Sequence, residues 1–482
     1  MTDAALTVPE SQSFPLRVAE LNIGAGSWPC PEDKLGRDKE IENLSPVLLN
    51  AQAPLVFALD APWGGGKTTF IKLWRHYLAH ESQQKVSLYL NAWESDFSED
   101  PLLALLSTFD TLFAAVDDQS TAKKAWENAK KCGPGLLKST AIAATKAATF
   151  GGLDLDKEYE KLVAEITGGL TGSLIDSFNI QKATLARFKE QISIALDALP
   201  DHQQNLIIFV DELDRCRPTY AIEVLERIKH LFDIDRVVFV LAINRDQLSK
   251  SLQGVYGPNF DGLHYLKRFI DLDYQLRVSD ITAYVDAKFS LLDIQSTFTN
   301  ISARNGNEER IIVRDMTAWL ASRFSYQPRD VDQFITRLRL ILRSIQTNHK
   351  VEPAVLVSML FLRGQNSDLY YRFQDDTTCV NLVIQFLAGG EIQNISLPRG
   401  FGWYMGCLIR SCCDDHTDSL PEGVSEFWVD QFEALEEDAP QKGEIRRLVQ
   451  MSTNITDTWD LSEIRKTAFS RIELVGQIDV SA

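Results

Sequence analysis

The chain has 482 residues, with 49 Lys and Arg against 67 Asp and Glu, and a formal net charge of −18. This acidic balance argues against nonspecific binding of the whole surface to nucleic acid or anionic lipid, although local basic patches remain possible. A hydrophobic content of 45% and a charged content of 24% are typical of folded domains and exclude general disorder. No stretch reaches the roughly 20 apolar residues of a membrane span. We therefore expect no integral membrane span. Seven cysteines without a visible disulfide framework indicate a reducing compartment, and we expect a cytoplasmic protein.

The elements predicted in chain order describe an α/β fold with a parallel sheet. Residues 33–50 have the spacing of a helix with Leu35, Ile41, Leu44, Val47 and Leu48 on one side. An almost unbroken apolar run at 54–60 is typical of a strand covered on both faces, and a glycine-rich loop and a helix follow it. Further strands are expected at residues 85–93, 206–214, 237–244 and 269–276. Beyond about 278 the patterns are helical.

The predicted organisation has four parts. Residues 1–32 form an N-terminal leader without the layout of a signal peptide. Residues 33–278 form a P-loop NTPase core that contains a large helical insertion at about 100–200. Residues 279–350 would be a helical lid, and 351–482 a helical C-terminal region to which the sequence assigns no role.

The segment APWGGGKT at 61–68 fits a phosphate-binding loop, except that Ala61 stands where the first glycine belongs. Small residues let successive backbone N–H groups turn toward a phosphate, and the helix that follows points its positive end at the same anion. Lys67 would bind the β- and γ-phosphates, and Thr68 would join a Mg²⁺ shell. The residues predicted to contact nucleotide are Pro62, Trp63, Gly64, Gly65, Gly66, Lys67, Thr68 and Thr69.

The segment LIIFVDELDR at 206–215 supplies a second half of the site. Asp211, at the end of the apolar run, would hold Mg²⁺ together with Thr68. Glu212 would polarise the attacking water as general base. Asp214 could support the metal or bind Arg215. Three acids within four residues after a buried strand are costly unless a cation lies there.

Taken together, these segments resemble the KAP family of P-loop NTPases. The resemblance rests on DKLGRDKEIENL, PWGGGKTTF, LYLNAWESDFSEDPL and IIFVDELDRCRP, with YLKRFIDLDYQL and QPRDVDQFITRL further along, and covers about 33–345. It implies ATP as the nucleotide. Many members carry membrane helices between the loop and the acidic strand, but charged residues interrupt this chain's insertion. Other members occur in bacterial phage exclusion and defence.

The resemblance also implies roles for three later residues. Asn244 would be a polar sensor for the attacking water, with a strand-end cap as the alternative. Arg268 would reach the γ-phosphate of a neighbouring copy, with an exposed surface arginine as the alternative. Lys267 and Arg215 are the other candidates for this role. Arg329 would report the γ-phosphate to the lid, with a salt bridge to Asp330 or Asp332 as the alternative. Trp63 would pack over the loop or near the base.

The sequence thus predicts a Mg²⁺-dependent ATPase that works as a homo-oligomer in anti-phage defence, with an effector protein encoded nearby. An alternative from another class is a nucleotide-gated scaffold that binds ATP and recruits an effector with little turnover. A nucleic-acid motor is possible but not indicated, because the chain is acidic and shows no recognisable nucleic-acid-binding module.

Overall fold

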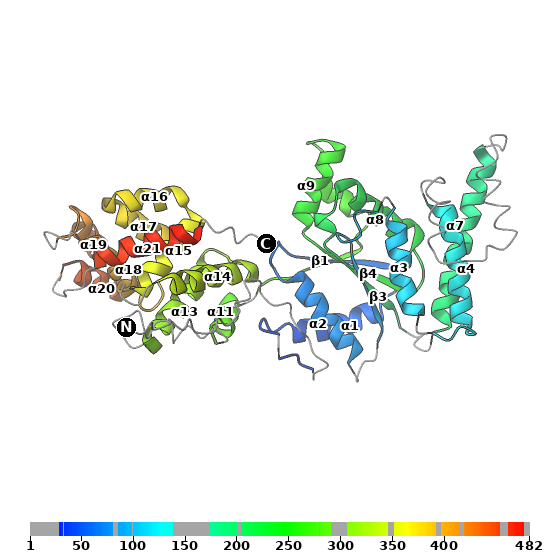
Figure 1. Ribbon diagram of the computed structural model, residues 1–482, viewed down its shortest axis with the longest axis horizontal. Coiled ribbons are helices and arrows are strands. Elements are labelled where there is room, and N and C mark those ends of the chain that lie inside the picture. Colours follow the sequence, from blue (N-terminus) through cyan, green and yellow to red (C-terminus); the bar gives the residue numbers. More distant parts are fainter. Residues whose placement is uncertain are drawn as a thin grey trace, which may run out of the picture. The chain divides into compact units, whose positions relative to one another are not determined.

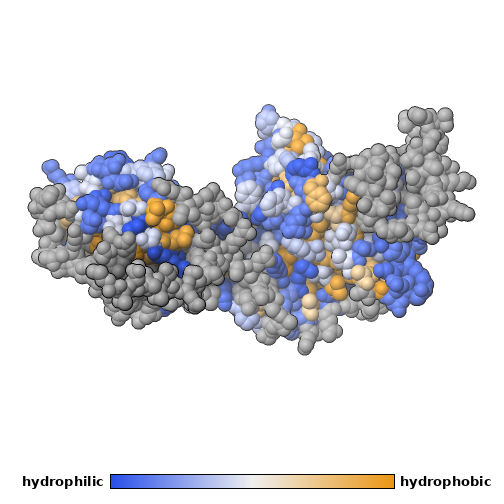
Figure 2. Space-filling view, in the orientation of Figure 1, coloured by the Kyte–Doolittle hydropathy of each residue, from blue (hydrophilic) through white to orange (hydrophobic). Residues whose placement is uncertain are grey.

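The computed structural model of the chain describes 28–31, 33–80, 85–98, 100–114, 116–137, 174–199, 204–278, 280–290, 306–345, 351–391, 397–413, 419–453 and 461–476. These residues fall into two compact units, one within Leu21–Arg277 and one within Val278–Ala482 (Figure 1). We call them the sheet unit and the helical unit. The predicted leader lies almost wholly outside the described residues. Most of the described surface on the face shown in Figure 2 is hydrophilic.

A five-stranded parallel sheet forms the centre of the sheet unit, and its order is β2-β3-β4-β1-β5. The strands are β1 (Leu55–Asp60), β2 (Ser87–Asn91), β3 (Leu206–Asp211), β4 (Val237–Ile243) and β5 (Leu272–Gln275). Every residue of β3 and β4 is buried, as expected for apolar runs covered on both faces. The predicted α/β fold is confirmed.

The fifth strand is shorter than the pattern at 269–276 indicated. Residues 267–269 form a turn after a short helix, and pairing with β1 begins between Leu272 and Phe57. β5 is an edge strand with one neighbour, so Leu272 is 48% exposed and the strand is not a core strand. The predicted helix at 33–50 begins only at Asp38, and Val47 is 55% exposed rather than on its buried side.

Helices cover both faces of the sheet. Side chains of α1 (Asp38–Leu49) and α2 (Lys67–Ala79) pack on one face, and those of α3 (Pro101–Phe113) and α8 (Pro218–Leu231) pack on the other. α4 (Thr121–Leu136) and α7 (Leu174–Asp197) pair within the predicted insertion, whose residues 138–173 lie outside the described chain. The unit also contains η1 (Leu213–Arg215), α9 (Arg245–Tyr256) and α10 (Gly262–Leu266).

The helical unit contains no strand among its described residues, which confirms the predicted helical C-terminal region. Its helices are α11 (Ile281–Ser290), α13 (Gly306–Arg323), α14 (Pro328–Ser344), α15 (Pro353–Gln365), α16 (Ser367–Asp375), α17 (Val380–Ala388), α18 (Phe401–Arg410), α19 (Val424–Glu433), α20 (Lys442–Thr453) and α21 (Leu461–Gly476), with η2 at Thr377–Cys379. α15 is buried from Pro353 to Leu362 and forms its centre. Within the described parts of both units, no helix is long and apolar enough to cross a bilayer.

Candidate nucleotide-binding site

The loop at 61–66 leaves the carboxyl end of β1 and leads directly into α2. Its positive φ angles fall on Gly64 (80°) and Gly66 (90°), where the absence of a Cβ permits a left-handed backbone. Ala61 extends the sheet instead, since its N–H donates to the carbonyl of Ile243 at 3.1 Å. The first position of the motif therefore does not need glycine here. The N-terminus of α2, whose first N–H groups have no partner within the helix, therefore lies at the carboxyl ends of the strands.

Lys67 is the first residue of α2 and is buried, with 9% of its surface exposed. Its Nζ donates to the Ala61 carbonyl at 2.8 Å and lies 4.0 Å from Oδ2 of Asp214. Burial lowers the pKa of Lys67, while the nearby carboxylates of Asp214 and Asp211 act in the opposite direction. The ammonium group of Lys67 thus lies near the acidic residues that follow β3.

Asp211 ends β3, and β4 lies between β3 and β1. The carboxyl ends of these parallel strands meet at one edge of the sheet, which brings Asp211 to the loop although 144 positions separate it from Lys67. The Asp211 carboxylate is 1% exposed, bonds to the hydroxyl of Thr68, and accepts from the hydroxyl of Tyr89 at 3.3 Å. Burial raises the pKa of Asp211, so a cation beside it would be stabilising. Hydroxyl and carboxylate oxygens are the donors that Mg²⁺ prefers.

Glu212 has a strained backbone, with φ at 60° in a region that costs a non-glycine residue about 1–2 kcal/mol. Its carboxylate is held from two sides. Nδ2 of Asn91 donates to it at 3.3 Å, and Nη1 of Arg215 lies 3.0 Å from it. The Arg215 guanidinium lies over the exposed Trp93 ring, 5.4 Å from its centroid. The predicted general base is therefore at the site but bound to its own neighbours.

The contacts of Asn91 with Glu212 and of Tyr89 with Asp211 were not predicted. Asn91 is a polar residue at the carboxyl end of the predicted strand 85–93, and that position is the signal that could have identified it. Tyr89 gave no such signal, because it alternates with apolar residues in the strand. Arg215 binds Glu212, whereas Asp214 accepts from Nε1 of Trp63 at 2.5 Å.

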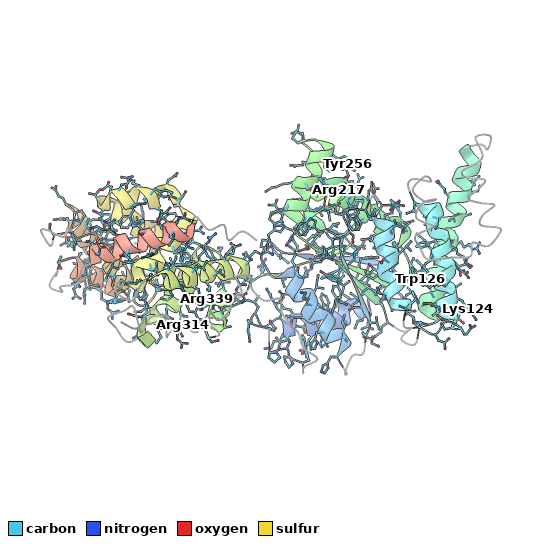
Figure 3. The ribbon with its side chains drawn as sticks, in the orientation of Figure 1. Lys124, Trp126, Arg217, Tyr256, Arg314 and Arg339 are labelled. Atoms are coloured by element: carbon cyan, nitrogen blue, oxygen red, sulfur yellow. The ribbon has the colours of Figure 1, made fainter. Side chains whose placement is uncertain are left out.

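The segment after β2 is fastened to the start of α8. The backbone N–H of Arg217 donates to Oδ2 of Asp96 at 2.9 Å, and its Nε donates to Oδ1 at 2.8 Å. Arg217 is labelled in Figure 3, beside α8. These bonds hold the turn that carries Trp93 next to the acidic turn at 211–215.

A model described as the KAP family P-loop domain matches residues 37–345, which is well over half of the chain. The chain belongs to the KAP family. Its phosphate loop, acidic strand end and fifth strand all lie within the matched range. Family membership therefore supports an NTPase fold and nucleotide binding.

Two further comparisons are more distant. The chain is 23% identical over 254 residues to a protein named Phage T7 exclusion protein from Escherichia coli (strain K12), a match covering 51% of this chain and 33% of that protein. The chain thus spans about a third of that relative's length. A solved structure of the Aeropyrum pernix ORC2 protein, described as ADPNP-ADP complexes, aligns over 92% of this chain and 95% of its own with 12% identity, but the TM-score is 0.27.

The later residues assigned through the KAP resemblance lie in different places. Asn244 follows β4 and caps α9, because its side chain accepts from the N–H of Gln247 at 3.1 Å. The sequence offered a cap at the strand end as the alternative, and the cap that Asn244 forms is that of the helix after the strand.

Arg268 is exposed in the turn between α10 and β5, with its guanidinium 5.7 Å from the centroid of the Tyr265 ring. Arg329 is exposed on the first turn of α14, in the helical unit. The carboxylates offered as its partners bind other groups. Asp330 accepts from the N–H of Gln327 at 2.8 Å, and Asp332 lies 2.7 Å from Nζ of Lys288.

Pro62 and Trp63 are exposed on the loop, whereas Gly65 is buried and Thr69 is half-buried on the first turn of α2. The structure thus brings the loop residues, Asp211 and Glu212 together. It does not place Arg268 among them, and Arg329 belongs to the other unit.

Proposed function

We propose that this KAP-family chain binds ATP with Mg²⁺ and hydrolyses the bond between the β- and γ-phosphates. The observation that carries the proposal is the convergence of the loop and the acidic strand end. Lys67 Nζ lies 4.0 Å from Asp214, and the Thr68 hydroxyl bonds to Asp211. A cation, a hydroxyl and carboxylates at a helix N-terminus are the groups that triphosphate and Mg²⁺ require.

Each group has a distinct task in this proposal. Lys67 and the loop N–H groups bind the phosphates, and Thr68 with Asp211 would hold Mg²⁺, which neutralises charge on the phosphate oxygens. Glu212 accepts the proton of the attacking water. Asn91 and Arg215 each contact one oxygen of the Glu212 carboxylate, and the remaining lone pairs could accept from water.

We propose Arg268 as a group supplied to a neighbouring copy. Asp271, three residues after Arg268, bonds to Val56 near the start of β1, whereas the loop follows Asp60 at the end of that strand. The four residue steps from Val56 to Asp60, at about 3.3 Å each, separate the two positions by roughly 13 Å. Arg268 therefore belongs to the end of the sheet opposite its own phosphate loop. A homo-oligomer in which this end meets another copy's site would complete that site with a positive charge.

The biological role that we propose follows the name of the E. coli relative. A KAP ATPase related to a phage exclusion protein would work in bacterial anti-phage defence, in the cytoplasm, and would act on an effector encoded nearby. Residues 279–350 would serve as a lid in which Arg329 senses the γ-phosphate.

A second candidate is a nucleotide-gated scaffold with little turnover. The ion pair between Glu212 and Arg215 favours the scaffold. A carboxylate with a guanidinium nitrogen 3.0 Å away activates water poorly until that contact is broken. An enzyme and a scaffold would both bind ATP, and only the enzyme would release phosphate steadily.

Phosphate release from purified protein with Mg²⁺ and ATP tests the proposal. Glu212→Gln removes the proton acceptor but keeps the shape, so turnover should fall by about 10²–10⁴-fold while ATP binding persists. Turnover that survives this substitution would eliminate Glu212 as the base. A wild-type protein that binds ATP without releasing phosphate, alone or assembled, would favour the scaffold.

A further inference from the structure

We propose that Asp214 is a positioning residue that ties the phosphate loop to the acidic turn through Trp63 and Lys67. The inference rests on the proposed nucleotide binding and deepens it. It assigns a task to the tryptophan inside the loop and to the last acid of the DELD segment. It also predicts that the position of the loop and the position of Glu212 are coupled.

The carboxylate of Asp214 contacts both Trp63 in the loop and Lys67 at the start of α2. Oδ2 of Asp214 accepts from Nε1 of Trp63 at 2.5 Å and lies 4.0 Å from Nζ of Lys67. The Asp214 side chain is 1% exposed, so water screens these contacts little. Its Oδ1 is buried without a hydrogen-bond partner among the described atoms, so Oδ2 carries these contacts. A hydrogen bond to a buried carboxylate is stronger than one between neutral groups.

Trp63 is 49% exposed, which is unusual for a tryptophan. Burial of its ring therefore does not explain its position, whereas the hydrogen bond of its indole N–H does. Asp214 lies 151 positions further along the chain, within η1 and two residues after Glu212. A shift of the loop must therefore move this turn or break the bond.

A double-mutant cycle on the full-length protein measures this coupling through the binding of ADP with Mg²⁺. Trp63→Phe keeps an aromatic ring but loses the N–H, and should weaken ADP binding about tenfold, whereas Asp214→Ala should weaken it at least about thirtyfold. In the Asp214→Ala background, Trp63→Phe should change the affinity by less than about twofold, because the two side chains act through one bond. Asp214→Asn retains an acceptor oxygen and should lie between wild type and Asp214→Ala.

Trp28→Phe is the matched control. Nε1 of Trp28 also donates to a carboxylate, that of Glu42 at 2.7 Å, and its ring contacts Tyr77 in the last turn of α2. This variant suffers the same chemical change in the same unit, away from the loop, and should bind ADP as wild type does. Equal weakening in Trp28→Phe would attribute the effect to general destabilisation and overturn the proposal.

Hydrogen exchange of the loop peptide gives a readout that needs no nucleotide. Exchange across residues 61–70 and 209–216 should accelerate together in Trp63→Phe and in Asp214→Asn. Faster exchange in the loop alone, or unchanged exchange in both segments, would contradict the coupling. So would independent effects of Trp63 and Asp214 on ADP affinity, which would indicate direct contact of the indole with nucleotide. Wild-type protein that binds neither ADP nor ATP would instead refute the proposed function.

Discussion

Lys67 in the sheet unit and Arg465 in the helical unit are buried cations that differ in what surrounds them. Lys67 and Arg465 are both 9% exposed. Lys67 contacts the Ala61 carbonyl and faces the carboxylates of Asp214 and Asp211, which come from a distant stretch of chain. Arg465 donates to the carbonyls of Ser411 and Phe373 at 3.1 and 3.3 Å.

Arg465 also lies over two rings, those of Phe373 and Phe469, at 5.6 and 5.9 Å. It joins α16, α21 and the end of α18 by satisfying backbone carbonyls, which is a structural task. Lys67 is instead placed where acidic side chains converge, a pattern that buried charges form when a ligand or metal completes the balance. Burial alone therefore does not distinguish a cation of a binding site from a structural cation. The chemical identity of its partners does.

The largest effect is expected at a third cation that neither unit buries. Arg268→Ala should reduce ATP turnover of the assembled protein about 10³-fold, because charge supplied to the transition state is lost, and should leave ATP binding by the isolated chain unchanged. Phosphate release measured above and below the concentration of assembly checks this. Lys267→Ala is the matched control, since Lys267 is the exposed neighbour of Arg268. A larger loss in Lys267→Ala would transfer the assignment to that residue.

Lys67→Met should weaken binding of ADP with Mg²⁺ at least about a hundredfold, because the ammonium that faces the phosphates is removed while the buried stem is kept. The thermal midpoint of the sheet unit should also fall, since the buried carboxylates of Asp214 and Asp211 lose the positive charge that faces them. Calorimetric titration and thermal unfolding measure the two quantities. A variant that retains wild-type affinity would show that Lys67 belongs with Arg465 as a structural cation.

Arg465→Met is expected to affect only the stability of the helical unit. It leaves the carbonyls of Ser411 and Phe373 without their donor, so the helical unit should lose about 2–3 kcal/mol of stability. Affinity for ADP should not change. Hydrogen exchange in α18 and α21 reports the loss of stability, and the same titration reports the affinity. Weaker ADP binding in this variant would contradict the division of tasks between the two units.

The smallest effect concerns backbone strain. Ser325 has φ at 53° in the exposed turn between α13 and α14, whereas Glu212 has φ at 60° at the site. Ser325→Gly should stabilise the helical unit by about 0.5–1 kcal/mol without changing turnover, because glycine adopts this conformation without a Cβ clash. Thermal unfolding checks the gain. A loss of stability would mean that the serine hydroxyl contributes more than the strain costs.

Much of the fold could be predicted because strands β3 and β4 are continuous apolar runs in which every residue is buried. The bounds of β5 were predicted less accurately, because an edge strand with one neighbour does not need a continuous apolar run. Phe269, which the sequence placed in this strand, belongs to the turn before it. The helix start at Asp38 was missed because Leu35 fits the helical spacing, although Gly36, with φ at 64°, interrupts the backbone before it.

By itself, the sequence determined that this chain carries a glycine-rich loop between an apolar strand and a helix, and acids at the end of another apolar strand. These are local patterns, set by backbone freedom at glycine and by the burial of apolar runs. Only the tertiary structure decided that β4 separates β1 from β3, that Asp214 binds Trp63 rather than Arg215, and that Arg268 lies at the end of the sheet away from the loop. Those outcomes depend on how parallel strands are ordered and how side chains compete for partners. Neither leaves a signal within a few neighbouring residues.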